Sequence, residues 1–221
     1  GLSDRSEDPF RWVFDSYDLD ADQHLIVFAS GKDRQVLPNE SSISGPEELE
    51  GLSVWLVAED IAAESQNLSD DGGVLSWSNR LGNAIVLSVG NPSRAPQLIS
   101  GELNGSAVVR FNSDSDALEA HEIRSGALAK SSEMTMFLVQ RTHAPRRTGS
   151  TLFFQSDSGR RINVHGLWSD GVLYFDFGQV ENRGRLAAAP PSGFLDEWRL
   201  VTLVRESGDR GKVYVNGVLL S

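Results

Sequence analysis

Short apolar segments recur along the chain at intervals of about ten residues, and clusters of Gly, Asn, Asp and Ser separate them. The segments are rich in Val, Ile, Leu, Phe, Trp and Thr, whereas helical periodicity is scarce. Many short strands at this spacing are typical of an all-β sandwich or barrel and argue against βαβ units. The pattern predicts strands at residues 11–14, 24–29, 53–57, 74–78, 84–88, 107–112, 117–121, 133–140, 151–156, 161–166, 172–178, 198–205 and 212–216.

Two of these segments are apolar on both faces. Residues 198–205 (WRLVTLVR) and, over a shorter length, 107–112 (AVVRFN) are predicted to be strands whose two faces are both covered by the core. Residues 31–50 are polar and contain Pro38, Gly45 and Pro46, so they are predicted to be a linker. A helical turn is expected at residues 47–52.

The composition limits the chemistry that this chain can carry. Its 221 residues contain no Cys, which excludes thiolate metal sites, a Cys nucleophile and disulfides. The formal net charge of −11 disfavours binding to a phosphate backbone, so nucleic acid is not an expected partner. No apolar run approaches the ~18–20 residues of a membrane span. No signal peptide is visible at Gly1, so a secreted protein would need a signal outside this sequence.

Several motifs between residues 52 and 221 occur together in one known family. The segments GLSVWLVAEDI, GVLSWSNRLGNAI and APQLISGELNGSAVVRFN are followed by EMTMFLVQR and by EWRLVTLVRESGDRGKVYVNGVLLS. Together they resemble laminin G-like modules of the concanavalin A-like superfamily, of the bacterial or marine phage type. The resemblance implies a jelly-roll β-sandwich of two antiparallel sheets, a secreted or cell-surface location and a polysaccharide or glycan as partner.

The chain departs from that family in three places. The usual W-D-x-S-G-N turn lacks its Asp between Trp77 and Asn83, and the usual Asp-Gly is Asn216-Gly217, which suits a type I′ hairpin turn. The last strands of the family are absent. A sandwich without them has an apolar edge that must be covered.

The first part of the chain has a separate resemblance. The segment DPFRWVFDSYDLDADQHLIVF is similar to the middle of a lamin-tail domain. The expected organisation is a lamin-tail-like fragment at 1–36, a linker at 37–51 and the sandwich at 52–221. Residues 10–30 are predicted to form strands that complete the sandwich, either within one chain or exchanged between two copies. A homodimer could therefore form by strand exchange or by pairing of sheet edges.

The hairpin at residues 160–178 holds the main candidate binding site. Alternation places one set of apolar residues on the core face and a polar and aromatic set on the opposite face. An aromatic ring can stack on the apolar face of a sugar while amides and carboxylates bond its hydroxyl groups. A cross-strand pair of Arg161 with Asp176 is expected on this face. The alternative is that Tyr174, His165 and Asp176 only solvate the hairpin and fix its register. The core set is Ile162, Val164, Leu173, Phe175 and Phe177, and the candidate ligand-binding set is Arg161, Asn163, His165, Trp168, Tyr174 and Asp176, with Val172 on the same face.

Catalytic and metal-binding patterns are weak. No HxH or HExxH spacing, G-x-S-x-G elbow, phosphate-binding loop or dinucleotide fingerprint is present. The E-x-D-x-x-E strand of retaining glucanases is also absent, which argues against a glycosidase. No cofactor is required, although the family resemblance makes Ca²⁺ an expected loop ligand and a hydrolase could use another divalent metal. The catalytic candidates are His165, His143, His121 and Asp176, and the Ca²⁺ candidates are Asp114, Asp116, Asp157 and Asp170.

Three functions remain open at this point. The favoured one is a non-catalytic carbohydrate-binding or adhesion module of a secreted multidomain bacterial protein. The alternatives are a promiscuous, metal-dependent hydrolase of esters, phosphoesters or glycosides, and a purely structural interaction module. The basic loop at residues 141–147 could attract sulfated or uronic polysaccharides, or it could be a solvated surface loop.

Overall fold

The computed structural model describes residues 26–29, 46–49, 51–82, 86–113, 116–119, 133–145, 151–155, 161–178, 184–206 and 210–221. Strands predominate and helices are short, so the predicted all-β class is confirmed. The strands are β1 Ile26–Ala29, β2 Leu52–Leu56, β3 Ser76–Ser78, β4 Val86–Ser88, β5 Gln97–Gly101, β6 Gly105–Arg110, β7 Met134–Arg141, β8 Leu152–Gln155, β9 Arg161–His165, β10 Leu173–Gly178, β11 Arg185–Ala188, β12 Trp198–Glu206, β13 Arg210–Val215 and β14 Val218–Leu219. The helical segments are η1 Pro46–Glu48, α1 Glu59–Ala62, η2 Ser65–Asn67 and η3 Pro92–Arg94.

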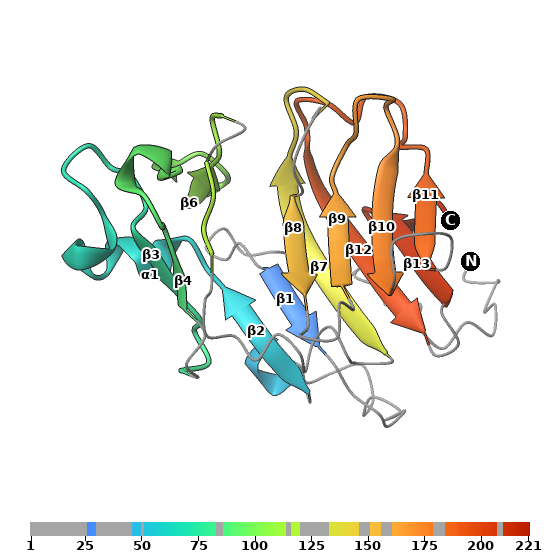
Figure 1. Ribbon diagram of the computed structural model, residues 1–221, viewed down its shortest axis with the longest axis horizontal. Helices are drawn as coiled ribbons and strands as arrows, with labels where there is room; N and C mark the ends of the chain where they lie inside the picture. Colours follow the sequence, from blue (N-terminus) through green and yellow to red (C-terminus); the bar gives the residue numbers. More distant parts are fainter. Residues whose placement is uncertain are drawn as a thin grey trace.

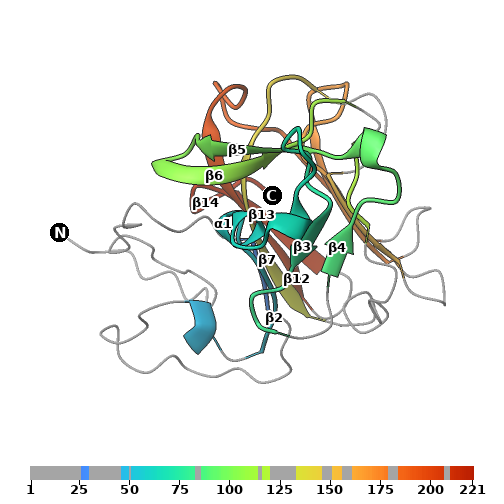
Figure 2. The ribbon, with the colours of Figure 1, turned by 90° about the vertical axis from the view of Figure 1, so that its left-hand side faces the viewer.

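Two sheets form the body of the molecule. One has the strand order β14-β13-β12-β7-β1-β2 and the other the order β11-β10-β9-β8. Figure 1 shows the four-stranded sheet lying in front of β7, β12 and β13, so the two sheets pack face to face. Two hairpins, β3-β4 and β5-β6, gather with α1 at one side of this sandwich (Figures 1 and 2).

The core lies between the two sheets. Phe175 of β10, Ile162 of β9 and Met136 of β7 are fully buried and belong to one apolar cluster, which also contains Val213 of β13. Burying each large apolar side chain contributes about 1.5–3 kcal/mol relative to leaving it exposed. This cluster is what holds the four-stranded sheet against the six-stranded one.

Strand β12 is covered on both faces, as its apolar pattern predicts. It pairs with β7 on one side and β13 on the other. Five consecutive residues from Val201 to Arg205 are buried, which requires both faces of the strand to be covered.

Strand β1 lies inside the larger sheet. It pairs antiparallel with β2 and with β7, so that Val27 faces Trp55 on one side and Phe137 on the other. Strands were expected within residues 10–30, and of this segment the structure describes only the four residues of β1. They occupy an interior position and do not cover the outer edge formed by β14, where Val218 is 64% exposed.

Some strand predictions were wrong. Residues 107–112 do not form a doubly covered strand, because among the described strands β6 pairs with β5 alone and Phe111 is exposed. The predicted strand at 117–121 is reduced, within the described residues 116–119, to a single bridge between Ser88 and Glu119. Strands β5, β11 and β14 were not among the predicted strands.

Asn79 stabilises β2 through hydrogen bonds to its backbone, and Asn216-Gly217 forms the turn of the β13-β14 hairpin. Asn79 accepts a hydrogen bond from the backbone N–H of Trp55 at 2.7 Å and donates to the carbonyl of Ser53, while the Trp77 indole donates to Val57. In the β13-β14 hairpin, Asn216 and Gly217 both have positive φ (49° and 77°), as the predicted type I′ turn requires. Among the described residues, no helix is long and apolar enough to cross a membrane.

Candidate functional site

The four-stranded sheet has one apolar and one polar face. Strands β9 and β10 pair so that His165 lies opposite Tyr174 and Asn163 opposite Asp176. The predicted core residues Ile162, Val164, Leu173, Phe175 and Phe177 are all buried in the apolar cluster. The opposite face, called here the polar face, consists of Asn163, His165, Tyr174 and Asp176, together with Arg185 of β11 and Trp168 of the β9–β10 loop.

The ion pair on the polar face differs from the predicted one. The strand register places Arg161 opposite Gly178 instead of Asp176. Asp176 instead lies opposite Arg185 of β11, whose guanidinium donates to both carboxylate oxygens at 2.6 and 2.7 Å. The Asp176 side chain is 7% exposed and that of Arg185 is 48% exposed, so a buried carboxylate is held by a cation at the surface. The Arg161 side chain lies outside the described part of the structure.

Two aromatic rings lie beside the ring of His165. Its ring lies 4.6 Å from that of Trp168 and 6.4 Å from that of Tyr174, both in edge-to-face geometry. The guanidinium carbon of Arg185 lies 5.0 Å from the Tyr174 ring centre, a cation–π contact. His165, Trp168 and Tyr174 are half-buried. Their rings therefore offer aromatic surface beside the polar groups of the same face.

The β9–β10 loop is fixed by Asp170. Its carboxylate accepts from the Tyr174 hydroxyl at 2.7 Å and from the backbone N–H of Val172 at 3.0 Å. The hydrogen bond from Tyr174 lowers the pKa of Asp170, and the same bond raises the pKa of Tyr174. This bond ties the loop that carries Trp168 to strand β10.

Asn163 has unused hydrogen-bonding capacity. Its side chain is buried, and its Nδ2 lies 3.2 Å from His165 Nε2. Its Oδ1 is buried and has no hydrogen-bond partner among the described residues. A buried acceptor without a partner costs about 1–3 kcal/mol, so an orphan of this kind calls for an explanation such as a ligand.

His143 belongs to a different cluster. Its Nδ1 lies 2.7 Å from Asp196 Oδ1, and both side chains are exposed. The nearby Glu102 carboxylate binds Arg141 and, at 3.2 Å, Arg110. Hydrogen bonding by Arg141 lowers the pKa of Glu102, and the charges of Arg110 and His143 act in the same direction. His121 lies outside the described residues.

Two of the four Ca²⁺ candidates, Asp116 and Asp170, lie within the described residues. Asp116 accepts from the backbone N–H groups of Asn112 and Ser113, and Asp170 is bound as described above. Asp114 and Asp157 lie outside the described residues. Within the part of the chain that the structure describes, no three His, Asp or Glu residues are grouped so that they could hold a metal ion.

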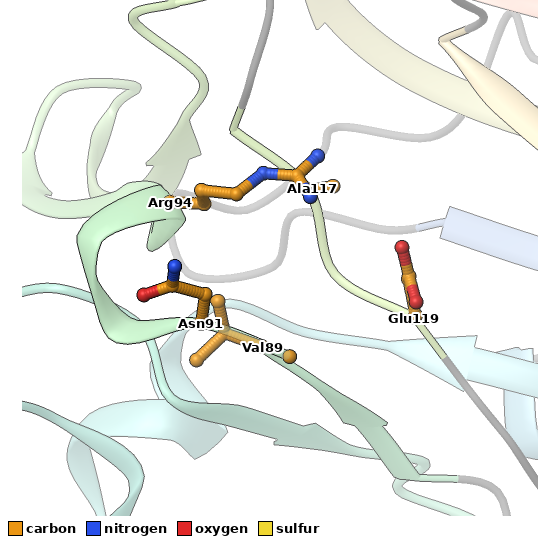
Figure 3. A pocket seen from close by; sticks show the side chains of 6 residues that line it. Val89, Asn91, Arg94, Ala117 and Glu119 are labelled. Carbon is orange, nitrogen blue, oxygen red and sulfur yellow. The ribbon is translucent and has the colours of Figure 1, made fainter.

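A separate pocket of about 250 Å³ lies beside η3 (Figure 3). Its Asn91 side chain is engaged as the cap of η3, accepting from the Ser93 backbone and hydroxyl. In Figure 3 the Arg94 side chain extends toward Ala117, while the Glu119 carboxylate lies apart from it. None of its lining residues belongs to the polar face; they are Val89, Gly90, Asn91, Arg94, Ala117 and Glu119.

Sequence reasoning missed Arg185. The residue lies in RLAA, and Ala favours strands poorly, so no strand was predicted there. The available signal was the place of this segment in the chain. A short segment that follows β10 closely can pair with the open edge of β10 as the next antiparallel strand. The Glu102–Arg141 pair was also missed, because it joins residues 39 positions apart in sequence.

Comparison with known proteins adds no assignment, since no family model, curated protein or solved structure matches this chain.

Proposed function

We propose that this protein is a non-catalytic carbohydrate-binding or adhesion module that binds a saccharide on the polar face of its four-stranded sheet. The proposal includes a secreted or cell-surface location and membership of the laminin G-like, concanavalin A-like type, with a jelly-roll arrangement of the strands. The all-β sandwich-like architecture is compatible with that membership.

One observation carries the proposal. A half-buried Trp168 ring lies next to His165, and His165 in turn lies beside Asn163, whose buried Oδ1 has no partner among the described residues. Saccharides need this combination, because an aromatic ring stacks on their C–H face and a nearby acceptor bonds a hydroxyl group. Tyr174 is less open to stacking, since the Arg185 guanidinium lies over its ring.

The Asp176–Arg185 pair supports the same interpretation. A surface guanidinium fixed by a buried carboxylate is held in one orientation and still has exposed area for a ligand. It would donate to hydroxyl oxygens or to the carboxylate of a uronic acid. The polar face therefore offers a donor on β11, an acceptor on β9 and an aromatic ring in the loop between β9 and β10.

The test is binding to a panel of neutral, uronic and sulfated glycans, measured with the wild type and with Trp168→Ala. We expect binding to at least one class, and a loss of about tenfold or more in affinity for Trp168→Ala, since stacking on an aromatic ring contributes about 1–3 kcal/mol. The matched control is Trp198→Ala, which removes another half-buried Trp, on β12 in the other sheet, where it lies under Arg141.

The control decides between a site and a general effect. Trp198→Ala should keep the affinity of the wild type. Failure of every glycan class to bind, or equal losses in the two variants, would contradict the proposal.

A hydrolase using His143 is the second candidate. The contact of His143 Nδ1 with Asp196 resembles the base and orienting carboxylate of a hydrolytic triad. Turnover of chromogenic esters, phosphoesters or glycosides that is lost in His143→Ala would favour this candidate. If no glycan binds and no substrate is turned over, a purely structural interaction module is the function that remains.

A further inference from the structure

The unusual feature of the polar face is the pairing of Asn163 with His165. The amide nitrogen Nδ2 of Asn163 lies 3.2 Å from His165 Nε2, and the amide oxygen Oδ1 is buried without a partner among the described residues. Asn163 is 7% exposed, so bulk water cannot readily satisfy that oxygen. The two amide atoms therefore have unequal environments.

The contact with Asn163 favours one tautomer of neutral His165. An amide NH₂ group only donates, so Nε2 must accept and cannot carry a proton in the neutral ring. The proton of neutral His165 then sits on Nδ1. Neutral imidazole has one donor and one acceptor nitrogen, and the partner of one nitrogen determines which tautomer is present.

We propose that the Asn163–His165 pair sets the hydrogen-bond polarity of the binding site. While His165 is neutral, the buried Oδ1 of Asn163 lacks a donor, so a ligand that displaces the side chains covering it gains by bringing one, such as the hydroxyl of a neutral saccharide. When His165 is protonated, Nε2 becomes a donor, the amide turns over to accept from it, and Nδ2 then faces the ligand. The protonated site favours an acceptor group, such as the carboxylate of a uronic acid.

The charged neighbours of His165 are engaged with one another. On β10, Tyr174 donates to Asp170 of the adjacent loop. Asp176 of β10 is bound by Arg185 of β11. The side chain of Arg161, on the same strand as His165, is outside the described residues.

The first experiment needs no ligand. Nitrogen-15 NMR of the histidine rings at pH 8 in the full chain reports which ring nitrogen of His165 carries the proton. We expect an unprotonated Nε2 and a protonated Nδ1. A protonated Nε2 would overturn the inference, because Asn163 Oδ1 would then have to face it and would not be available to a ligand.

The Asn163→Asp variant sharpens this test. Its carboxylate has no donor, so it should pull the His165 proton to Nε2 and invert the tautomer. Tyr174→Phe is the control, because it leaves both partners of the pair in place and should keep the wild-type tautomer. A wild-type tautomer in Asn163→Asp would show that Asn163 does not control the ring.

The second experiment rests on the proposed saccharide binding. Galacturonate hexamers and neutral galactose hexamers are compared as probes at pH 8 and pH 5. We expect the affinity ratio of uronate to neutral sugar to rise about tenfold at pH 5 in the wild type, and by less than twofold in His165→Gln. A ratio that rises equally in both proteins would overturn the switch. If neither probe binds, the proposed function fails for these sugars. The position of the His165 proton, measured by NMR, still tests whether Asn163 controls the ring.

Discussion

The two faces of the four-stranded sheet use the same strands for different purposes. Phe175 and Tyr174 are neighbours on β10, yet Phe175 is fully buried in the core and Tyr174 is half-buried on the polar face. On the inner face the side chains are held by apolar packing. On the outer face they are held by directional bonds, such as those of Asp176 to Arg185.

This difference separates stability from recognition. The inner face has a continuous apolar cluster that repays the entropy of ordering the strands. The outer face contains a buried acceptor without a partner among the described residues, which a structure selected for stability alone would avoid. Replacing residues of the two faces should therefore have effects of different size and kind.

The largest effect is expected from Phe175→Ala. Removing a fully buried ring should lower the free energy of unfolding by about 3–5 kcal/mol. The neighbouring Tyr174→Ala should cost roughly 1 kcal/mol, since that ring is partly solvated and loses one hydrogen bond. Urea unfolding of both variants measures the contrast. Equal losses would show that the outer face is as much a part of the packed core as the inner one.

A smaller difference is expected within the ion pair on the polar face. Arg185→Ala leaves the buried Asp176 carboxylate without its two charge-assisted bonds and should cost about 1–3 kcal/mol. Asp176→Asn leaves an arginine that is about half exposed and can be solvated, so its cost should be about 1 kcal/mol or less. The same unfolding measurement compares them. A larger loss for Asp176→Asn would mean that the guanidinium, not the carboxylate, is the buried partner.

The smallest effect is a change in pH dependence in Tyr174→Phe. The Tyr174 hydroxyl lowers the pKa of Asp170, so Asp170 contributes stability above its unfolded-state pKa, and this contribution is lost as the pH falls through the folded-state value. The raised pKa of Tyr174 gives the opposite dependence, a contribution present below its unfolded-state pKa and lost as the pH rises through the folded one. In Tyr174→Phe the contribution of Tyr174 should disappear, and that of Asp170 should shrink to the part that the backbone N–H of Val172 supplies.

Carbon-13 NMR of the Asp170 carboxyl follows this change directly. In the variant its pKa should move up toward the ordinary value for Asp, while the tertiary fold stays intact. An unchanged titration of Asp170 would show that the backbone N–H of Val172 alone is responsible for the lowered pKa.

The inner face was predictable from the sequence and the outer face only in part. Strand alternation is a local property, so it correctly assigns Ile162, Val164 and Phe177 to the core. It does not identify the partner of Asp176, because the loop length between β9 and β10 does not fix the register and β11 carries no clear strand pattern. Alternation alone predicts Arg161 as the partner of Asp176, because it places both side chains on the same face.

The sequence pattern also does not predict which strands lie next to each other in the sheets. The apolar pattern of β6 resembles that of β12, but burial depends on which strands pair with it, and β6 has a partner on one edge only among the described strands. Similarly, the pattern of residues 24–29 predicts a strand and does not say that β1 will lie between β2 and β7. The orphan acceptor of Asn163 is a property of the assembled face and has no sequence signal.

The most direct test of the central claim is to map where a saccharide binds, residue by residue. Amide and side-chain NMR shifts are recorded while the best ligand from the glycan panel is added to the full chain. The account predicts that the largest shifts occur at Asn163, His165 and Trp168. Shifts centred on Arg141 and His143, or on the pocket beside η3, would place the binding site elsewhere and contradict it.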